Sequence, residues 1–311
     1  APAACDIVMA MLDTLDHLIL SVQDLDSAVR AYTRILGRTP SWRGEHPGAG
    51  TINALFRIDN TYVELLAPEG EGPIGNALRT RLSDEGEGLA GLAFGTSDAD
   101  ACHARFAQQG LHPLPVEEGM GRDVDSGAFR RWRRVPLAPG ETRGVLIFAL
   151  EHLSEPEILP RAGALGAEEA SVHALDHVVV QTADPDAAKI LYGEKLGLRL
   201  ALDREFPQWH SRMLFFRVGG ATVEVVAGAD GSADEQAPAA DRDRLSGLCW
   251  RVGDAEAARA RLAEEGFDVS EVRPGRKPGT RVFTLRDGSC GIPTLMLEAG
   301  PAGQATGRAR G

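Results

Sequence analysis

The chain has 311 residues, of which 43% are hydrophobic and 25% charged, as is typical of a folded protein rather than a disordered one. Its 45 acidic and 33 basic residues give a net charge of -12, which argues against a nucleic-acid-binding protein. No apolar run reaches the roughly 20 residues that cross a membrane, so a membrane partner is not expected. The length exceeds that of one ordinary domain and predicts two.

The four cysteines show no CxxC spacing, which favours free thiols and a cytoplasmic location. Cys249 lies two residues after Gly247, on the same face of a regular strand, but nothing nearby in the sequence activates it as a nucleophile. The first ten residues lack the pattern of a signal peptide, and Met9 or Met11 resembles a natural start. Residues 300–311 are rich in Gly, Ala and Arg and are expected to be disordered.

An internal duplication organises the chain. Leu15-Asp16-His17 recurs 160 residues later as Leu175-Asp176-His177, and the same offset carries Val63-Glu64 to Val223-Glu224. A second offset relates Gly91 to Gly247 and Asp98 to Asp254. A weaker similarity relates the two parts of each half. The sequence therefore predicts four related units in two pairs.

The pattern in each unit predicts elements in the order β-α-β-β-β. In the first, residues 17–22 form a strand, Asp24 or Asp26 caps a helix that Gly37 ends, and strands follow around 40–42, 51–58 and 62–66. The expected fold class is α+β, with two tandem domains of two such units each. The predicted boundaries are 13–153 (modules 13–68 and 88–153), a linker at 154–172, and 173–299 (modules 173–228 and 244–299).

A His and a Glu recur at the same positions in the two halves. His17 begins the first strand of its unit, and Glu64 lies in the last strand among apolar neighbours. If the two strands are adjacent and both side chains face a concave sheet, they converge as metal ligands, and His177 and Glu224 repeat the arrangement. The alternatives are a structural His and a Glu that faces water. Duplication also copies pairs that have no function.

A further carboxylate closes each half. Glu151 and Glu298 end the last predicted strands and are candidate third ligands that exchange between metal binding and general-base catalysis. A solvent-exposed strand-end Glu is the alternative, and His152 is a substitute ligand in the first domain only.

Candidate substrate-binding residues occur in both halves. Arg57 and Arg217 occupy equivalent strand positions and suit a carboxylate or phosphate, although an exposed strand Arg is the simpler interpretation. The residues predicted to line a pocket, with core packing as the alternative for the aromatics, are Trp42, His46, Trp209 and His210.

These residues together resemble the vicinal oxygen chelate superfamily, which contains glyoxalase I, bleomycin resistance proteins, extradiol dioxygenases and methylmalonyl-CoA epimerase. The resemblance covers residues 15–298, and the first half is most similar to the glyoxalase-like branch through residues 42–48 (WRGEHPG), 53–56 (NALF) and 62–66 (YVELL). It implies that the two units of each domain form an incomplete barrel around a central cavity, with a divalent metal held by the first and fourth strands of both units. The implied ligands are His17, Glu64 and Glu151 in one domain, and His177, Glu224 and Glu298 in the other.

One departure affects the implied reaction. Gly91 and Gly247 stand where some relatives carry a further ligand, so the two-His, one-carboxylate triad of extradiol dioxygenases is incomplete. The resemblance implies a metal-dependent lyase or isomerase of the glyoxalase type, acting on a small oxygenated organic substrate with Fe, Mn, Ni, Zn or Mg. The alternatives are an extradiol-type dioxygenase and a metal-free drug- or metabolite-binding protein. The chain is expected to be a monomer or a homodimer.

Overall fold

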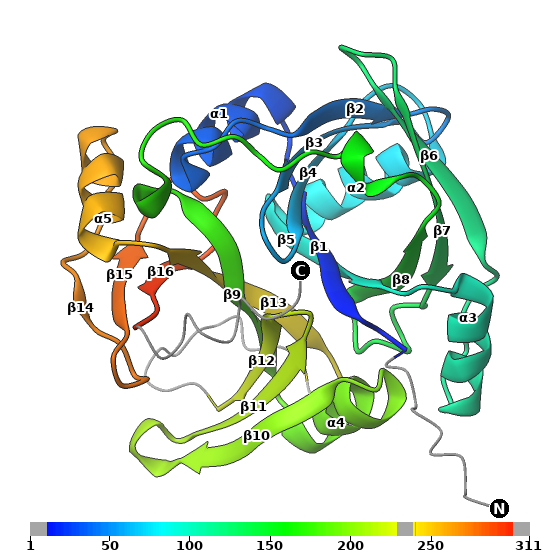
Figure 1. Ribbon diagram of the computed structural model, residues 1–311. Coiled ribbons are helices and arrows are strands. Elements are labelled where there is room, and N and C mark those ends of the chain that lie inside the picture. The colour runs from blue at the N-terminus through cyan, green and yellow to red at the C-terminus, as the bar shows by residue number, and fades with distance from the viewer. Residues whose placement is uncertain (1–10, 229–238, 240, 301–311) are drawn as a thin grey trace, which may run out of the picture.

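The computed structural model describes residues 11–228, 239 and 241–300, so the expected tail lies outside the described residues except for Gly300. Two eight-stranded sheets form two domains, each flanked by helices (Figure 1). The predicted α+β fold with two tandem domains is confirmed.

The elements of the first domain follow the predicted order, with one helix added between its two modules. They are β1 (Thr14–Ser21), α1 (Leu25–Leu36), β2 (Trp42–His46), β3 (Thr51–Arg57), β4 (Tyr62–Pro68), α2 (Pro73–Glu85), β5 (Gly88–Gly95), α3 (Ala99–Gln108), β6 (Glu117–Asp123), β7 (Phe129–Pro136) and β8 (Leu146–His152).

Two short helical turns, η1 (Pro156–Ile158) and η2 (Glu168–Ala170), lie between the domains. The second domain then contains β9 (Val172–Thr182), α4 (Pro185–Lys189), η3 (Ile190–Lys195), β10 (Arg199–Phe206), η4 (Pro207–Trp209), β11 (Ser211–Val218), β12 (Ala221–Ala227), β13 (Asp243–Val252), α5 (Ala255–Glu264), β14 (Arg273–Pro274), β15 (Arg281–Leu285) and β16 (Thr294–Glu298).

The ends of α1 are those that the sequence predicts. The Asp24 side chain accepts a hydrogen bond from the backbone N–H of Ser27, which satisfies a free donor of the first turn. Gly37 ends the helix at φ 66°, a left-handed conformation that glycine adopts without a steric penalty. The same Asp cap recurs at Asp98 and Asp254, which confirms that the modules share a local fold.

Strand pairing places the first and fourth strands of a module side by side. In the first domain β1 runs parallel to β4 and antiparallel to β5, and in the second β9 is parallel to β12 and antiparallel to β13. The first sheet closes into a barrel through the short β2–β6 pairing at Gly44 and Glu45. The second sheet runs from β10 to β14 without closing, so it alone keeps the expected incomplete form.

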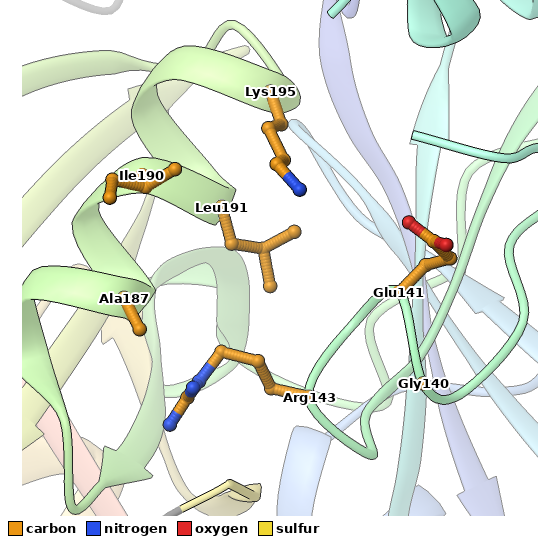
Figure 2. A pocket seen from close by; sticks show the side chains of 7 residues that line it. All are labelled: Gly140, Glu141, Arg143, Ala187, Ile190, Leu191 and Lys195. Carbon is orange, nitrogen blue, oxygen red and sulfur yellow. The ribbon is translucent and has the colours of Figure 1, made fainter. Parts of the chain in front are cut away.

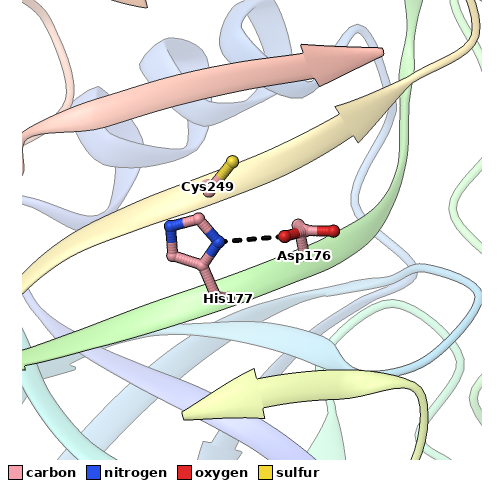
Figure 3. A group of neighbouring side chains, drawn as sticks. All are labelled: Asp176, His177 and Cys249. Carbon is pink, nitrogen blue, oxygen red and sulfur yellow. Dashed lines mark hydrogen bonds and ion pairs between the residues drawn. The ribbon is translucent and has the colours of Figure 1, made fainter. Parts of the chain in front are cut away.

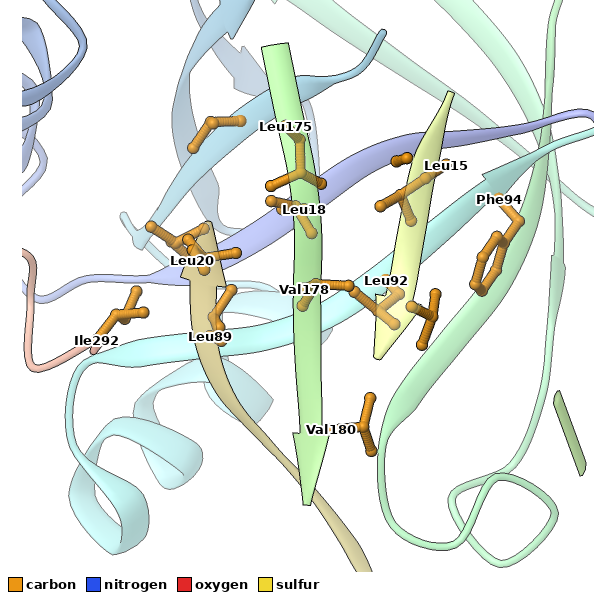
Figure 4. Close-up of a cluster of buried hydrophobic side chains, with 14 of the residues drawn as sticks. Leu15, Leu18, Leu20, Leu89, Leu92, Phe94, Leu175, Val178, Val180 and Ile292 are labelled. Atoms are coloured by element: carbon orange, nitrogen blue, oxygen red, sulfur yellow. The ribbon is translucent and has the colours of Figure 1, made fainter. Parts of the chain in front are cut away.

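The main hydrophobic core lies between the two sheets. Side chains from the outer faces of β1 and β5 pack with those of β9 and β13 (Figure 4). Leu18, Leu92, Leu175 and Val178 are fully buried there. The sheets are therefore packed back to back, and their inner faces point away from the shared core.

Arg38 forms hydrogen bonds with the segment that joins the domains. Its guanidinium is fully buried and donates to the carbonyl oxygens of Val172 and Ala162 (2.9 Å for the latter) and to the Glu168 carboxylate at 2.5 Å. The carbonyl oxygen of Ala162 in the connecting segment and that of Val172 at the start of β9 thus gain a buried donor.

Among the described residues, no helix is long and apolar enough to cross a membrane.

Candidate functional site

A β-bulge precedes the His of the His–Glu pair in each domain. In the β1–β5 pairing the register shifts between Leu15 and His17, and in the β13–β9 pairing it shifts at the equivalent point, skipping Asp176. Neighbouring strand residues normally face opposite ways, whereas a bulge turns an extra residue toward the same side. Each Asp thereby reaches the His that follows it.

In the first domain, Asp16 orients His17 toward Glu64. The Asp16 carboxylate contacts His17 Nδ1 at 2.7 Å and His152 Nε2 at 2.7 Å. The free Nε2 of His17 lies 3.5 Å from Glu64 Oε2. Burial alone would raise the pKa of Asp16, but the hydrogen bonds from His152 and His17 outweigh burial and hold it well below its usual range.

Aromatic and polar side chains enclose this pair. His17 stacks on Tyr62 at 4.5 Å between ring centroids and meets the Phe148 ring edge-on at 5.7 Å. Asn53 Nδ2 donates to Glu64 Oε1 at 2.7 Å, and His46 Nε2 lies 3.9 Å from the same oxygen. Burial lowers the pKa of His46, which favours its neutral form at pH 7.

The interior of the barrel is also covered by α2. Leu78 and Leu82 of this helix join Ile19, Ala93 and Phe148 in one buried cluster. As a result the side chains of His17 and Glu64 are only 4% and 10% exposed.

The second domain repeats the pair with different neighbours. Asp176 contacts His177 Nδ1 at 2.9 Å, and His177 Nε2 lies 3.5 Å from Glu224 Oε2. Arg251 Nε donates to Asp176 at 2.8 Å, so an Arg occupies the place that His152 takes in the first domain. The side chains of His177 and Glu224 are 19% and 13% exposed, and the pair is therefore more accessible than its counterpart.

The pKa values of the second group follow from these contacts. For Asp176, burial is outweighed by the hydrogen bond from His177 and the charge of Arg251, so its pKa lies well below the usual range. For His177, burial is outweighed by hydrogen bonds to Asp176 and Cys249, which raise its pKa well above its ordinary value. The sequence analysis missed both Asp residues and Cys249 as members of the site.

Strand register shows which residues of the second module of each domain occupy the positions equivalent to the His and the Glu. His17 and Gly91 occupy equivalent positions in the two modules of the first domain, because the helix caps Asp24 and Asp98 follow them at the same spacing. His17 pairs with Tyr62 in β1–β4, and Gly91 pairs with Leu146 in β5–β8, so Tyr62 is equivalent to Leu146. Glu64 therefore corresponds to Phe148. The same comparison in the second domain matches His177 with Gly247 and Glu224 with Leu295.

Glu151 and Glu298 do not join the His–Glu pairs, which corrects their predicted placement. Each lies three residues beyond the equivalent of Glu64, on the opposite face of its strand. Glu151 accepts the backbone N–H of Ala99 at 3.0 Å, at the start of α3. Glu298 accepts that of Ala255 at 2.9 Å, at the start of α5, and Arg281 contacts it. Both carboxylates act as helix N-terminal acceptors.

The two predicted substrate-binding arginines have protein partners. Arg57 Nη1 donates to the carbonyl oxygens of Pro156 and Leu159 at 2.8 and 2.6 Å, so it secures the interdomain segment. Arg217 Nη1 donates to Thr222 Oγ1 at 2.8 Å, on the strand that carries Glu224. The structure thus removes Arg57 from the site and leaves Arg217 beside it.

Of the predicted pocket residues, those of the first domain lie with the His–Glu pair and those of the second do not. Trp42 and His46 lie in the barrel with His17, and the Arg130 guanidinium lies over the rings of Trp42 and Tyr62 at 5.6 and 5.4 Å. Trp209 and His210 instead lie in the β10–β11 connection. Trp209 stacks on Phe206 there. This connection precedes the start of β11 at Ser211, whereas the residue of β11 that pairs with Glu224 is Phe215.

Two pockets lie outside the His–Glu groups. One of about 240 Å³ opens between the β7–β8 loop and the α4–η3 segment, where Glu141 and Arg143 face Leu191 and Lys195 (Figure 2). Another, of about 250 Å³, is lined by His46 and Thr51 together with Glu45, Glu69 and Glu71. His46 thus connects the second pocket with the Glu64 group.

Family models match both halves of the chain. A glyoxalase-like domain model matches residues 15–173, and a model of the glyoxalase/bleomycin resistance protein/dioxygenase superfamily matches residues 176–284. The chain belongs to the vicinal oxygen chelate superfamily. The predicted family resemblance is therefore confirmed.

Individual relatives support the family and the fold. An ethylmalonyl-CoA/methylmalonyl-CoA epimerase of Cereibacter sphaeroides is 29% identical over 105 residues, covering 33% of this chain and 76% of the relative. A triple mutant of 4-hydroxymandelate synthase from Streptomyces coelicolor superposes with a TM-score of 0.66 at 16% identity, covering 92% of both chains. A hypothetical protein from Staphylococcus aureus gives 0.61 at 10% identity, covering 91% of this chain and 98% of that one.

The donor geometry tests whether a divalent metal fits this vicinal oxygen chelate protein. Two ligand atoms that are each about 2.1 Å from a tetrahedral ion lie about 3.4 Å apart. The His Nε2 to Glu Oε2 distance is 3.5 Å in both domains. In the first domain, however, the two remaining family positions hold Gly91 and Phe148, and the Phe148 ring packs against His17. In the second domain these positions hold Gly247 and Leu295, and the further donor next to His177 is Cys249, in a group with Asp176 (Figure 3).

Proposed function

We propose that this protein is a divalent-metal-dependent enzyme of the glyoxalase type, and that its second domain is the working site. The observation that carries the proposal is the partly exposed His177–Glu224 pair, whose donor atoms have the spacing of two metal ligands. A bound divalent ion would act there as a Lewis acid that holds neighbouring oxygens of a small organic substrate and stabilises negative charge on them.

The side chains of the second domain support lyase or isomerase chemistry. Asp176 holds His177 Nδ1, which fixes the ring with Nε2 toward the inner face of the sheet. Glu224 is the carboxylate beside Nε2 and takes the proton-transfer role expected of Glu298, since Glu298 is engaged at the start of α5. Arg217, on the same strand pair, suits an acidic group of the substrate.

Elemental analysis of the full chain tests the location of the metal. We expect about one divalent ion per chain in the wild type, loss of that ion in His177→Ala, and its retention in the matched variant His17→Ala. Absence of metal in the wild type, even after Zn(II), Mn(II), Ni(II) or Fe(II) is added, contradicts the proposal. Loss of metal from His17→Ala alone would move the working site to the first domain.

A substrate screen then tests the reaction class. Metal-loaded protein is incubated with α-ketoaldehyde thiol adducts, acyl-CoA epimers and catechols. Turnover of either of the first two without oxygen consumption supports lyase or isomerase chemistry. Ring opening of a catechol with oxygen uptake would instead establish a dioxygenase, a reaction that Gly91 and Gly247 make less favourable because neither supplies a second His.

The first domain favours a second candidate function, metal-free binding of an aromatic acid. Asn53 Oδ1 is buried without a hydrogen-bond partner, and the buried Arg130 has no carboxylate within ion-pair distance among the described residues. The buried cation is suited to an acidic group, the unpartnered amide oxygen to a hydroxyl donor, and the surrounding rings to an aromatic ligand. Binding of aromatic carboxylates to metal-stripped protein, weakened in Arg130→Ala, tests this function, and equal binding by both proteins contradicts it.

A further inference from the structure

A row of side chains on the inner face of the second sheet leads from Glu224 to the edge strand β10. Strand register places Glu224 opposite Phe215, and Phe215 opposite Leu202, so the three side chains project from one face. Leu202 is 43% exposed, although it is a large apolar side chain. The row is therefore a partly uncovered apolar surface that begins at a proposed metal ligand and ends at the edge of the sheet.

The next row along the same strands ends on a cation. Arg204 pairs with Met213, two residues from the first row on each strand, so its side chain projects from the same inner face. Its guanidinium lies 5.2 Å from the centre of the Phe206 ring. The neighbouring acid, Asp203, projects from the opposite face and binds Arg212 at 2.8 Å. The carboxylate next to Arg204 in the sequence is thus engaged elsewhere.

A second cation reaches β10 from the other edge strand of the sheet, β14 (Figure 1). Arg276, in the β14–β15 connection, has its guanidinium 4.0 Å from the centre of the Trp209 ring and its Nη1 4.0 Å from Met213 Sδ. Trp209 stacks on Phe206 with 5.1 Å between ring centroids. The guanidinium groups of Arg204 and Arg276 thus lie on two stacked rings. Among the described residues, neither has a carboxylate within ion-pair distance.

The first domain closes its barrel at the corresponding point. Gly44 occupies the duplicated position of Arg204 and pairs with Asp123 of β6. A Cβ atom at Gly44 would lie 2.7 Å from the carbonyl oxygen of Arg122, which is closer than such atoms approach, so this closure depends on glycine. The second half carries a long cationic side chain at this position, and its sheet stays open there.

We propose that Arg204 and Arg276 form an anion-binding site at the open edge of the second domain, and that this site holds an acidic group of the substrate. The ring beneath each guanidinium restricts its movement, while the N–H groups in the guanidinium plane stay free to bind the oxygens of a carboxylate or phosphate. Restricting a flexible side chain before binding lowers the entropic cost of binding.

This inference rests on the proposed function and specifies the class of its substrate. Two strand spacings of about 4.8 Å and two residues of about 3.4 Å separate the backbone of Arg204 from that of Glu224, which places the two about 12 Å apart. The matching substrate has its reacting oxygens at one end and an anionic group at the other. Its middle segment is apolar and covers Phe215 and Leu202.

Equilibrium binding of matched probes to the metal-stripped full chain tests the anion site without any measurement of activity. The probes are phenylbutanoate, phenylbutyl phosphate and the neutral phenylbutanol, which share a ring and a chain. Each measurement is repeated with Arg130→Ala, which removes the aromatic-acid binding proposed for the first domain. We expect both acids to bind more tightly than the alcohol. Arg204→Ala and Arg276→Ala should each weaken binding of the acids by about fivefold or more and leave that of the alcohol nearly unchanged.

Arg286→Ala is the matched control, because Arg286 is exposed, pairs with Asp268 at 2.9 Å and lies beyond the end of β15 that is remote from Arg276. It removes the same charge and should leave all three affinities unchanged. The inference is overturned by equal affinities for acids and alcohol, or by acid binding that Arg204→Ala and Arg276→Ala leave unchanged. Weaker acid binding in Arg217→Ala alone also overturns it, since the anion then lies at the other end of β11. Because the assay contains no metal, these outcomes are independent of the elemental analysis, which tests the proposed function.

Discussion

His17 and His177 occupy duplicated positions, yet their surroundings differ. Each has its Nδ1 held by the preceding Asp and its Nε2 3.5 Å from a Glu. In the first domain Tyr62 and Phe148 pack against the His ring inside a closed barrel, whereas in the second the sheet is open and Cys249 lies opposite the ring. The pair and its orientation are thus the same in both domains, while the side chains around the pair differ.

The largest expected effect concerns a difference between the halves that lies outside the two His–Glu pairs, at the buried Arg38. Arg38 →Met should lower the free energy of unfolding by about 3 kcal/mol, because two buried carbonyl groups lose their donor. Chemical denaturation measures this change. Leu198 occupies the duplicated position and is the matched control, since Leu198→Met nearly conserves volume and should cost less than about 1.5 kcal/mol. Equal costs would show that the linker contacts of Arg38 contribute nothing specific.

An intermediate effect distinguishes the carboxylates at the starts of helices from those of the His–Glu pairs. Glu298→Gln should lower stability by about 0.5–2 kcal/mol through weaker contacts with the start of α5 and with Arg281, and Glu151→Gln should behave similarly at α3. Neither variant should change the metal content measured by elemental analysis. Metal loss from Glu298→Gln with normal stability would restore this residue as a ligand.

The smallest effect tests a contact that the second half lacks. Asp59 in the β3–β4 turn binds His173 at 3.2 Å and Arg161 at 2.8 Å, whereas Gly219 occupies the duplicated position. The hydrogen bond from His173 and the charge of Arg161 lower the pKa of Asp59. Because its folded pKa is below its unfolded value near 4, the contact stabilises the protein above that pH and is lost as the pH falls further.

Asp59→Asn should therefore cost less than about 1 kcal/mol at pH 7, since the ion pairs are half exposed. The difference from the wild type should shrink in acid, as followed by denaturation at several pH values. Asp84→Asn, at an exposed position on α2, is the control. A difference that grows as the pH falls would contradict the assigned role of Asp59.

The sequence predicted the features that depend on local pattern and repetition. The repeated modules, the Asp24 cap, the Gly37 stop and the family were all correct. The meeting of His17 with Glu64 required only that the first and fourth strands be neighbours, which the structure shows. What these residues bind stays a prediction.

The errors arose where strand register decides the outcome. Glu151 was predicted to be a ligand because it ends a strand, but three residues separate it from the position equivalent to Glu64, and an odd shift reverses the face. The bulges at Asp16 and Asp176 leave no signal in residue type. Cys249 was visible as a residue on the face of Gly247, but only the antiparallel pairing with β9 places it opposite His177.

The back-to-back sheets explain why a domain can be retained after its site has diverged. One continuous core covers the outer faces of β1 and β5 on one side and β9 and β13 on the other. Neither half can lose its fold without exposing apolar surface of its partner to water. Selection for the stability of the second domain therefore also preserves the first, which leaves the interior of the first barrel free to acquire another ligand or none.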